Sequence, residues 1–317
     1  MHFGHQKGMR YSVLILDNRG MGKSDRPLLR YTTSEMARDV LEVLDHVGWT
    51  ENRSVHVCGS SSMFCEPSQP ILCHQPETTS QPCTQQANTR VKKVGGMIAQ
   101  ELACLAPTRL CSLNLVSTAA VLENTTTWAE HLTSRVRVLL PKSEDQSVRS
   151  TADSCFAHAW LRGADDAEVP RPDTTPRCRF PPSATGDEDG EGGYRRFKSN
   201  YARFAAQDVA KRRDPGRGFT TLGFLLQAAA VATHRKTEAQ LRAALVDVLG
   251  RERILVLHGV EDKMIHVPHG RRLIEILRPA RALVVEGVGH APFLERTAWF
   301  NALLEEACAS AEKLSGR

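Results

Sequence analysis

An aspartate and a histidine follow two apolar segments near the C-terminal end of the chain. Residues 253–258 (RILVLH) lead into GVED, which ends at Asp262, and residues 281–285 (RALVV) lead into EGVGH, which ends at His290. Both segments are predicted as buried strands, because they are short, continuous and apolar. In a parallel sheet the carboxyl ends of neighbouring strands share one edge. At such an edge a histidine can act as a general base, while a carboxylate holds its tautomer and stabilises the imidazolium.

Two alternatives remain open for this pair from the residues alone. Asp262 is predicted as the acid, rather than Glu261, because of its spacing from the preceding glycine. The other alternative is that Asp262 is an ordinary turn residue and that His290 caps a helix. The order of the two residues, each soon after a predicted strand, favours the catalytic interpretation.

A serine run after an earlier predicted strand supplies a candidate nucleophile. Residues 53–58 (RSVHVC) lead into Gly59-Ser60-Ser61, the first half of a G-x-S-x-G turn. The second half appears only in VGGMIAQELA, which begins at Val94. Without residues 62–93 the chain would contain VHVCGSSVGGMIAQELA, a complete nucleophile elbow. Ser61 is therefore the candidate nucleophile, and an ordinary loop serine is the alternative.

The segment between the two halves of this turn, residues 62–94, shows neither helical nor strand periodicity. It is rich in Gln, Ser, Thr, Pro and Cys, so no regular element is predicted in it. A fold tolerates such an insertion, since loop closure costs only about 0.6 kcal/mol per doubling of length. Catalysis tolerates less, since a misplacement of about 1 Å can cost on the order of 10²-fold in rate. We hypothesise that residues 62–93 are a translated intron or a recent insertion.

The elements that position these residues alternate between strands and amphipathic helices. The predicted strands cover residues 11–16, 53–58, 111–117, 253–258 and 281–285. The predicted helices cover residues 33–47 or 34–47, 95–106, 224–232, 238–249 and about 297–311. Strands that alternate with helices predict a mostly parallel sheet with helices on both faces.

The middle of the chain lacks strand signals and divides the predicted core. Residues 1–119 and 250–317 are predicted to form the two parts of one α/β core, and residues 62–94 are an irregular insertion in the first part. Residues 120–249 are predicted to form a helical cap, because helical patterns replace strands there. Within the cap, residues 170–193 are rich in Pro, Asp, Glu and Gly and are predicted to be a disordered loop.

Five segments resemble successive landmarks of the α/β-hydrolase superfamily, and the chain is most similar to its fungal esterase and proline-iminopeptidase-like members. The segments are VLILDNRGMGKSDRP, VHVCGSS with GGMIAQELA, LNLVSTAA, ILVLHGVEDKMI and EGVGHAPFLER. The resemblance implies that Ser61 is the nucleophile, Asp262 the acid and His290 the base. It also implies a small-molecule ester, lactone, thioester or amide as substrate, and an acyl-enzyme that needs no cofactor or metal. The elbow lacks the tryptophan usual in proline iminopeptidases, which favours esters.

The chain also departs from this superfamily. Its members have strands before the one that matches VLILD, and a His-Gly loop that supplies one oxyanion-hole amide. Only ten residues precede the first predicted strand, so we expect the first strands and that donor to be missing. Loss of one donor typically costs about 10²–10³ in rate. These departures keep open an alternative of another class, a hydrolase fold without turnover that acts as a binding scaffold or is a non-functional gene product.

Composition argues against several other classes of protein. The net charge of +5 is small for 317 residues, and the basic residues are scattered, so nucleic acid is not expected as a partner. No apolar run approaches the roughly 20 residues that a membrane span needs. The N-terminal residues MHFGHQKGMR show no secretory signal, and the nine cysteines form no CxxC pair, so a cytoplasmic location is expected.

Two further patterns resemble ligand sites only superficially. The segment DNRGMGKS ends like a phosphate-binding loop, but Asp17 stands where that loop needs a glycine, and the following DRP prevents a helix from starting at the lysine. The insertion also contains four residues of types that bind zinc, but their spacing matches no zinc pattern. These residues are Cys65, Cys73, His74 and Cys83. No nucleotide, cofactor or metal is therefore expected.

Overall fold

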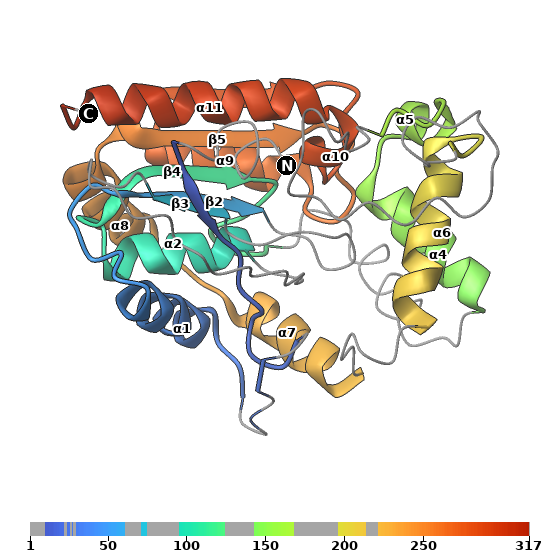
Figure 1. Ribbon diagram of the computed structural model, residues 1–317, viewed down its shortest axis with the longest axis horizontal. Helices are drawn as coiled ribbons and strands as arrows, with labels where there is room; N and C mark the ends of the chain where they lie inside the picture. Colours follow the sequence, from blue (N-terminus) through green and yellow to red (C-terminus); the bar gives the residue numbers. More distant parts are fainter. Residues whose placement is uncertain are drawn as a thin grey trace.

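A six-stranded sheet forms the centre of the computed structural model (Figure 1). The structure describes residues 10–21, 24–25, 27, 30–60, 71–74, 95–123, 143–167, 196–213 and 221–316. Its strands are β1 (Ser12–Leu14), β2 (Val55–Ser60), β3 (Ile71–His74), β4 (Leu110–Val116), β5 (Ile254–Gly259) and β6 (Arg281–Val285). Their order is β1-β3-β2-β4-β5-β6, and β3 is the one strand of the six that runs antiparallel to its neighbours. The prediction of a mostly parallel sheet is confirmed.

Side chains alternate between the two faces of the sheet, and different helices cover each face. In β4, Leu113 and Leu115 join one buried cluster and Val116 joins the other. The covering helices are α1 (Thr33–His46), α2 (Gly95–Leu105), α9 (Val267–Leu277) and α11 (Thr297–Lys313). The first three pack on one face and α11 on the other (Figure 1). Because both faces are covered, β2, β4 and β5 are buried along their whole length.

A second group of helices lies beyond the carboxyl ends of the strands, on the right of Figure 1. Its members are α4 (Glu144–Cys155), α5 (His158–Arg162) and α6 (Asn200–Arg213). They lie in residues 120–249, which were predicted to be helical, but the sequence patterns gave bounds for none of the three. For α4 the missed signal is a capping box, in which the side chains of Ser143 and Gln146 each accept a backbone hydrogen bond from the other residue. The three helices pack around Phe156 and Phe204.

The segments after this helical group return to the core. They are α7 (Thr221–Thr233), α8 (Glu238–Leu241), a π-helix (Arg242–Leu249) and a short 3₁₀ turn (Arg251–Arg253), and α10 (Pro292–Glu295) follows later in the chain. Leu241 and Leu245 are buried in the same cluster as α2 and α9. Among the described residues, no helix combines the length and the apolar character needed to cross a membrane.

A short strand within the insertion contradicts one expectation from the sequence. Residues 71–74 form β3, which pairs antiparallel with both β1 and β2, although no element was predicted in residues 62–94. A four-residue apolar run is too short to show a period. Its place between two strands gives the backbone groups along both facing edges a partner. Ser61, the remainder of residues 62–94 and the loop 170–193 lie outside the described residues.

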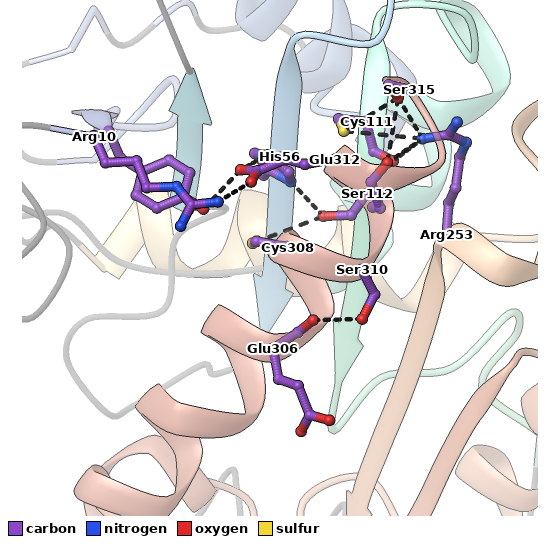
Figure 2. Close-up of polar contacts among 12 residues, drawn as sticks. Arg10, His56, Cys111, Ser112, Arg253, Glu306, Cys308, Ser310, Glu312 and Ser315 are labelled. Atoms are coloured by element: carbon purple, nitrogen blue, oxygen red, sulfur yellow. Dashed lines mark hydrogen bonds and ion pairs between the residues drawn. The ribbon is translucent and has the colours of Figure 1, made fainter. Parts of the chain in front are cut away.

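A buried polar network fastens α11 to the second face of the sheet (Figure 2). The carboxylate of Glu312 on α11 accepts a hydrogen bond from Tyr11 Oη at 2.6 Å and pairs with Arg10. Its Oε1 also lies 3.2 Å from Nε2 of His56 on β2. The other ring nitrogen of His56, Nδ1, lies 2.8 Å from Ser112 Oγ on β4. The network therefore joins two strands and a helix that are far apart in the sequence.

The pKa values of His56 and Glu312 differ from the ordinary values of these groups in opposite directions. Burial alone would lower the pKa of His56, but Cys308 and hydrogen-bonded neighbours that include Glu312 raise it well above 6.5. Burial alone would raise the pKa of Glu312, but hydrogen bonds, led by that from His56, lower it from 4.5 to about 2. The pair is therefore charged across the physiological pH range.

Replacing Glu312 with glutamine is expected to lower the free energy of unfolding by about 3 kcal/mol near pH 6, because it leaves a buried imidazolium without its carboxylate. The contribution of Glu312 is present above pH 4.5 and is lost as pH falls toward 2. That of His56 is complete below pH 6.5 and is lost as pH rises through its raised pKa. Urea unfolding of the wild type and the variant across this range should show the largest difference between pH 4.5 and 6.5.

Glu306→Gln on the same helix is the matched control. Glu306 pairs with Arg281 at the surface, with 66% of its side chain exposed. Its loss should cost less than about 1 kcal/mol. Equal effects of the two substitutions would contradict the importance of the buried pair.

Candidate active site

Asp262 and His290 lie in contact at the carboxyl ends of β5 and β6. Nδ1 of His290 is 2.6 Å from Oδ2 of Asp262, and both side chains are buried. The sequence predicted this pairing from the order of the strands. Glu261 follows β5 in the same loop, but Asp262 is the residue whose carboxylate contacts the histidine.

Two glycines allow the loops that carry these residues to approach closely. A Cβ on Gly259 would lie only 2.2 Å from the carbonyl oxygen of Gly289, so β5 and the histidine loop meet backbone to backbone. Gly287 adopts a φ of +67°, a left-handed conformation that favours glycine. The amide of Glu261 donates to the carbonyl oxygen of Val288 at 2.9 Å. The backbone thus fixes the separation of acid and histidine.

The carboxylate of Asp262 is held by several donors. Its Oδ1 accepts hydrogen bonds from the amides of Met264 and Ile265, both at 2.9 Å. Burial alone would raise the pKa of Asp262, but the charge of His290 and hydrogen bonds from His258 and His290 lower it well below its ordinary range. Asp262 is therefore an anion that can orient the imidazole and stabilise its protonated form.

His258 is a second histidine on the same carboxylate, and the sequence analysis gave it no role. Its Nε2 lies 2.7 Å from the carbonyl oxygen of Ile265 and 3.3 Å from Oδ2 of Asp262. A carbonyl oxygen can only accept, so this Nε2 carries a proton that it donates to Ile265, while Asp262 lies beside it. The opposite side of the ring is enclosed by Gly270, where a Cβ would lie 2.3 Å from Nδ1. This close fit fixes the ring.

Nε2 of His290, the ring nitrogen that does not contact Asp262, can act as a general base. Nε2 of His290 is buried and has no hydrogen-bond partner among the described residues. Because Nδ1 donates to a carboxylate, Nε2 carries the lone pair that a general base needs. Ser60 ends β2 at the same edge of the sheet, and its buried Oγ likewise has no partner in the described part of the chain. Ser61 is the next residue but lies outside the described residues.

The two halves of the interrupted serine turn meet in the fold. A Cβ on Gly59, near the end of β2, would lie 2.6 Å from the carbonyl oxygen of Gly95 and 2.9 Å from Cα of Gly96. A Cβ on Gly96 would lie 2.5 Å from the Thr118 side chain, which follows β4. The strand end and the helix start are therefore in direct contact although residues 62–94 separate them. This close contact is what a strand-turn-helix elbow requires.

A cleft of about 410 Å³ opens beside the acid loop. Residues of the loop and of the start of α9 line one side, and His158 of α5 lines the other. At its rim Nζ of Lys263 lies 2.9 Å from Nε2 of His158. The helical group α4–α6 therefore contributes to the surroundings of Asp262. Among the described residues, no group of three or more His, Cys, Asp or Glu side chains is arranged so that it could hold a metal ion.

Comparison with solved structures defines the fold class. The chain is similar to a thermophilic esterase from Thermogutta terrifontis, with a TM-score of 0.55, 15% identity, and coverage of 93% of this chain and 78% of that one. It is similar to a hydrolase from Pseudomonas aeruginosa PA01, with a TM-score of 0.51, 22% identity, and coverage of 92% and 77%. It is also similar to Est816, described as an N-acyl homoserine lactone degrading enzyme, with a TM-score of 0.54, 19% identity, and coverage of 92% and 80%.

These likenesses establish the α/β-hydrolase fold, which confirms the fold class predicted from the sequence. No family model matches the chain, and no curated protein matches it in sequence. The identities are too low to carry an activity from these proteins to this one, so the function must be argued from the site.

Proposed function

We propose that the protein is a serine hydrolase that cleaves a small carboxylic ester through Ser61, His290 and Asp262. The observation that carries the proposal is the 2.6 Å contact between His290 Nδ1 and Asp262 Oδ2, which leaves His290 Nε2 without a partner among the described residues. The proposal is supported by β2, which runs parallel to the strands that precede Asp262 and His290 and continues directly into Ser61. Catalysis of this kind needs a nucleophile, a base and an orienting acid.

In the proposed reaction His290 Nε2 takes the proton of Ser61 Oγ as the oxygen attacks the acyl carbon. Asp262 stabilises the resulting imidazolium, and His290 then returns the proton to the leaving alcohol. Water, activated by the same histidine, attacks the acyl-enzyme and releases the acid together with free Ser61. His290 passes the proton that it takes from this water to Ser61 Oγ, which restores the free hydroxyl, and no cofactor takes part.

The substrate class is argued from the sequence of the elbow and from the structural neighbours. The structural neighbours include an esterase and a lactone-degrading enzyme, and the GSS elbow sequence favours esters over peptide amides. We therefore propose esters first, then lactones, thioesters and amides. The likeness to fungal esterases and proline-iminopeptidase-like enzymes stays part of this proposal, as do a cytoplasmic location and a cap formed by residues 120–249.

A fluorophosphonate probe tests the proposal directly, because it reacts with a serine that is activated by a general base. Labelling is expected at Ser61, absent in Ser61→Ala and strongly reduced in His290→Ala. Ser60→Ala is the matched control, since it removes the adjacent hydroxyl and should leave labelling of Ser61 in place. Folded wild-type protein that takes up no probe would contradict the proposal.

One observation favours a second candidate function of a different class. The insertion that follows Ser61 contributes β3 to the sheet, so the elbow is interrupted by a segment built into the fold. An interrupted elbow removes the constraint that points the amide after the serine toward the oxyanion. The alternative is therefore a hydrolase fold that binds a ligand without turnover. Absence of labelling in folded protein would favour it.

A further inference from the structure

Glu295 is a buried carboxylate that contacts backbone amides from two separate parts of the fold. Its side chain belongs to α10 and the residue is 6% exposed. Oε1 accepts a hydrogen bond from the amide of Gly289 at 2.9 Å, and Oε2 accepts one from the amide of Ala157 at 3.0 Å. Gly289 immediately precedes His290, whereas Ala157 lies between α4 and α5. One side chain therefore bonds to both the histidine loop and the outer helical group.

Hydrogen bonds from backbone amides are the main stabilising interactions of the Glu295 carboxylate. These hydrogen bonds, which most favour its charged form, include those from the amides of Ala157 and Gly289. Burial raises the pKa of Glu295 to about 7, with a smaller contribution from Glu261. Burial of a carboxyl group is unfavourable unless hydrogen bonds offset it, and here the offsetting bonds join two separate segments of the chain.

The same two segments meet at a second point. The amide of His290 donates to the carbonyl oxygen of Cys155 at 2.7 Å, at the end of α4. A Cβ on Gly289 would lie 2.7 Å from that same oxygen, so the two backbones touch. The corner between α4 and α5 is thus linked to the histidine loop twice: Cys155 accepts from the amide of His290, and Glu295 accepts from the amides of both Ala157 and Gly289. A displacement of the α4–α5 corner would move the histidine with it.

We propose that Glu295 is a positioning residue, which sets the place of His290 by tying its loop to the corner between α4 and α5. The role in catalysis rests on the proposed function, whereas the tie itself does not. Through these two hydrogen bonds of Glu295, a movement of α4–α6 on substrate binding also moves His290. Loss of the tie loosens both segments and displaces the base from the nucleophile.

Hydrogen exchange tests the tie without any need for turnover. Glu295→Gln replaces one acceptor oxygen with an NH₂ group, so one of the two amides faces a donor. Exchange at Gly289 or Ala157 is expected to accelerate about tenfold, the equivalent of one net hydrogen bond, while amides of β4, β5 and α11 keep their rates. Glu286→Gln, an exposed carboxylate on the same loop, is the matched control and should change neither site.

A second variant keeps the test decisive if Glu295→Gln does not fold. Ala157 has a φ of −63°, which suits proline. Phe156 before it is extended, with φ −128° and ψ 152°, which suits a residue that precedes proline. Ala157→Pro therefore removes the backbone N–H that donates to Oε2, at a position whose φ and ψ values suit proline. Faster exchange of residues 286–291 in this variant would show that the two segments are coupled.

The rate of fluorophosphonate labelling then separates positioning from general stability. Both variants are expected to label Ser61 about tenfold more slowly or worse, since small displacements of a catalytic group are costly, while Glu286→Gln labels at the wild-type rate. Unchanged exchange at Gly289 and Ala157, uniformly faster exchange of the whole sheet, or an unchanged labelling rate would each overturn the proposal. If the wild type itself fails to label, the proposed function fails, and exchange at Gly289, His290 and Ala157 still decides whether Glu295 positions the histidine loop.

Discussion

Replacing His290 with alanine is expected to lower kcat for ester hydrolysis about 10⁶-fold, because removal of the histidine or the nucleophile of a catalytic triad costs about as much as removal of all three residues. Asp262→Asn should lower it by about 10⁴, since an amide no longer holds the imidazole in the tautomer that leaves Nε2 free. The 2.6 Å contact of Asp262 Oδ2 with His290 Nδ1 is the geometric basis for both effects. Steady-state hydrolysis of short-chain p-nitrophenyl esters measures them.

Glu261→Gln is the matched control for this series. Glu261 is adjacent to Asp262 and carries the same charge, but its side chain is not the one that contacts His290. The variant should hydrolyse esters at close to the wild-type rate. A collapse of activity in Glu261→Gln, with Asp262→Asn unaffected, would assign the acid to the other carboxylate and refute the arrangement proposed for the site.

Removal of residues 62–93 is expected to raise the rate of Ser61 labelling on the order of 10²-fold or more. The deletion joins Ser61 to Val94 and so restores an uninterrupted turn between β2 and α2. The rate should rise because a serine misplaced by about 1 Å loses on the order of 10²-fold, and because a recovered oxyanion amide contributes about 10²–10³. The core is already suited to this join, since Gly59 touches Gly95 and Gly96 in the intact chain.

The deletion also removes β3, so its stability has to be measured beside its reactivity. β1 and β2 both run antiparallel to β3 and hence parallel to each other, so they can pair directly once it is gone. Deletion of residues 75–93 alone keeps β3 and leaves Ser61 separated from Gly95, and it should not raise the rate. A folded 62–93 deletion that labels no faster than the wild type would show that the insertion does not limit the elbow.

The strands and the acid–histidine pair could be predicted because their signals are local. Short apolar runs at residues 253–258 and 281–285 indicate strands of a covered sheet; β6 has the predicted bounds, and β5 is shifted slightly, to Ile254–Gly259. Parallel strands place their carboxyl ends at one edge, so the position of each residue after its strand was enough to predict that Asp262 and His290 meet. Ser61 remains a prediction of the sequence, since it lies outside the described residues.

The sequence by itself therefore determined the fold class and the meeting of Asp262 with His290, whereas the catalytic roles of these two residues and of Ser61 are proposals. The tertiary structure decided what supports them: β3 between β1 and β2, the buried His56–Glu312 pair, His258 behind Asp262, and Glu295 between Ala157 and Gly289. The physical reason is that hydrophobic periodicity fixes which face of an element is buried, but it does not name the polar partner that meets it there. Such partners are far apart along the chain, and only the packed fold brings them within hydrogen-bond distance.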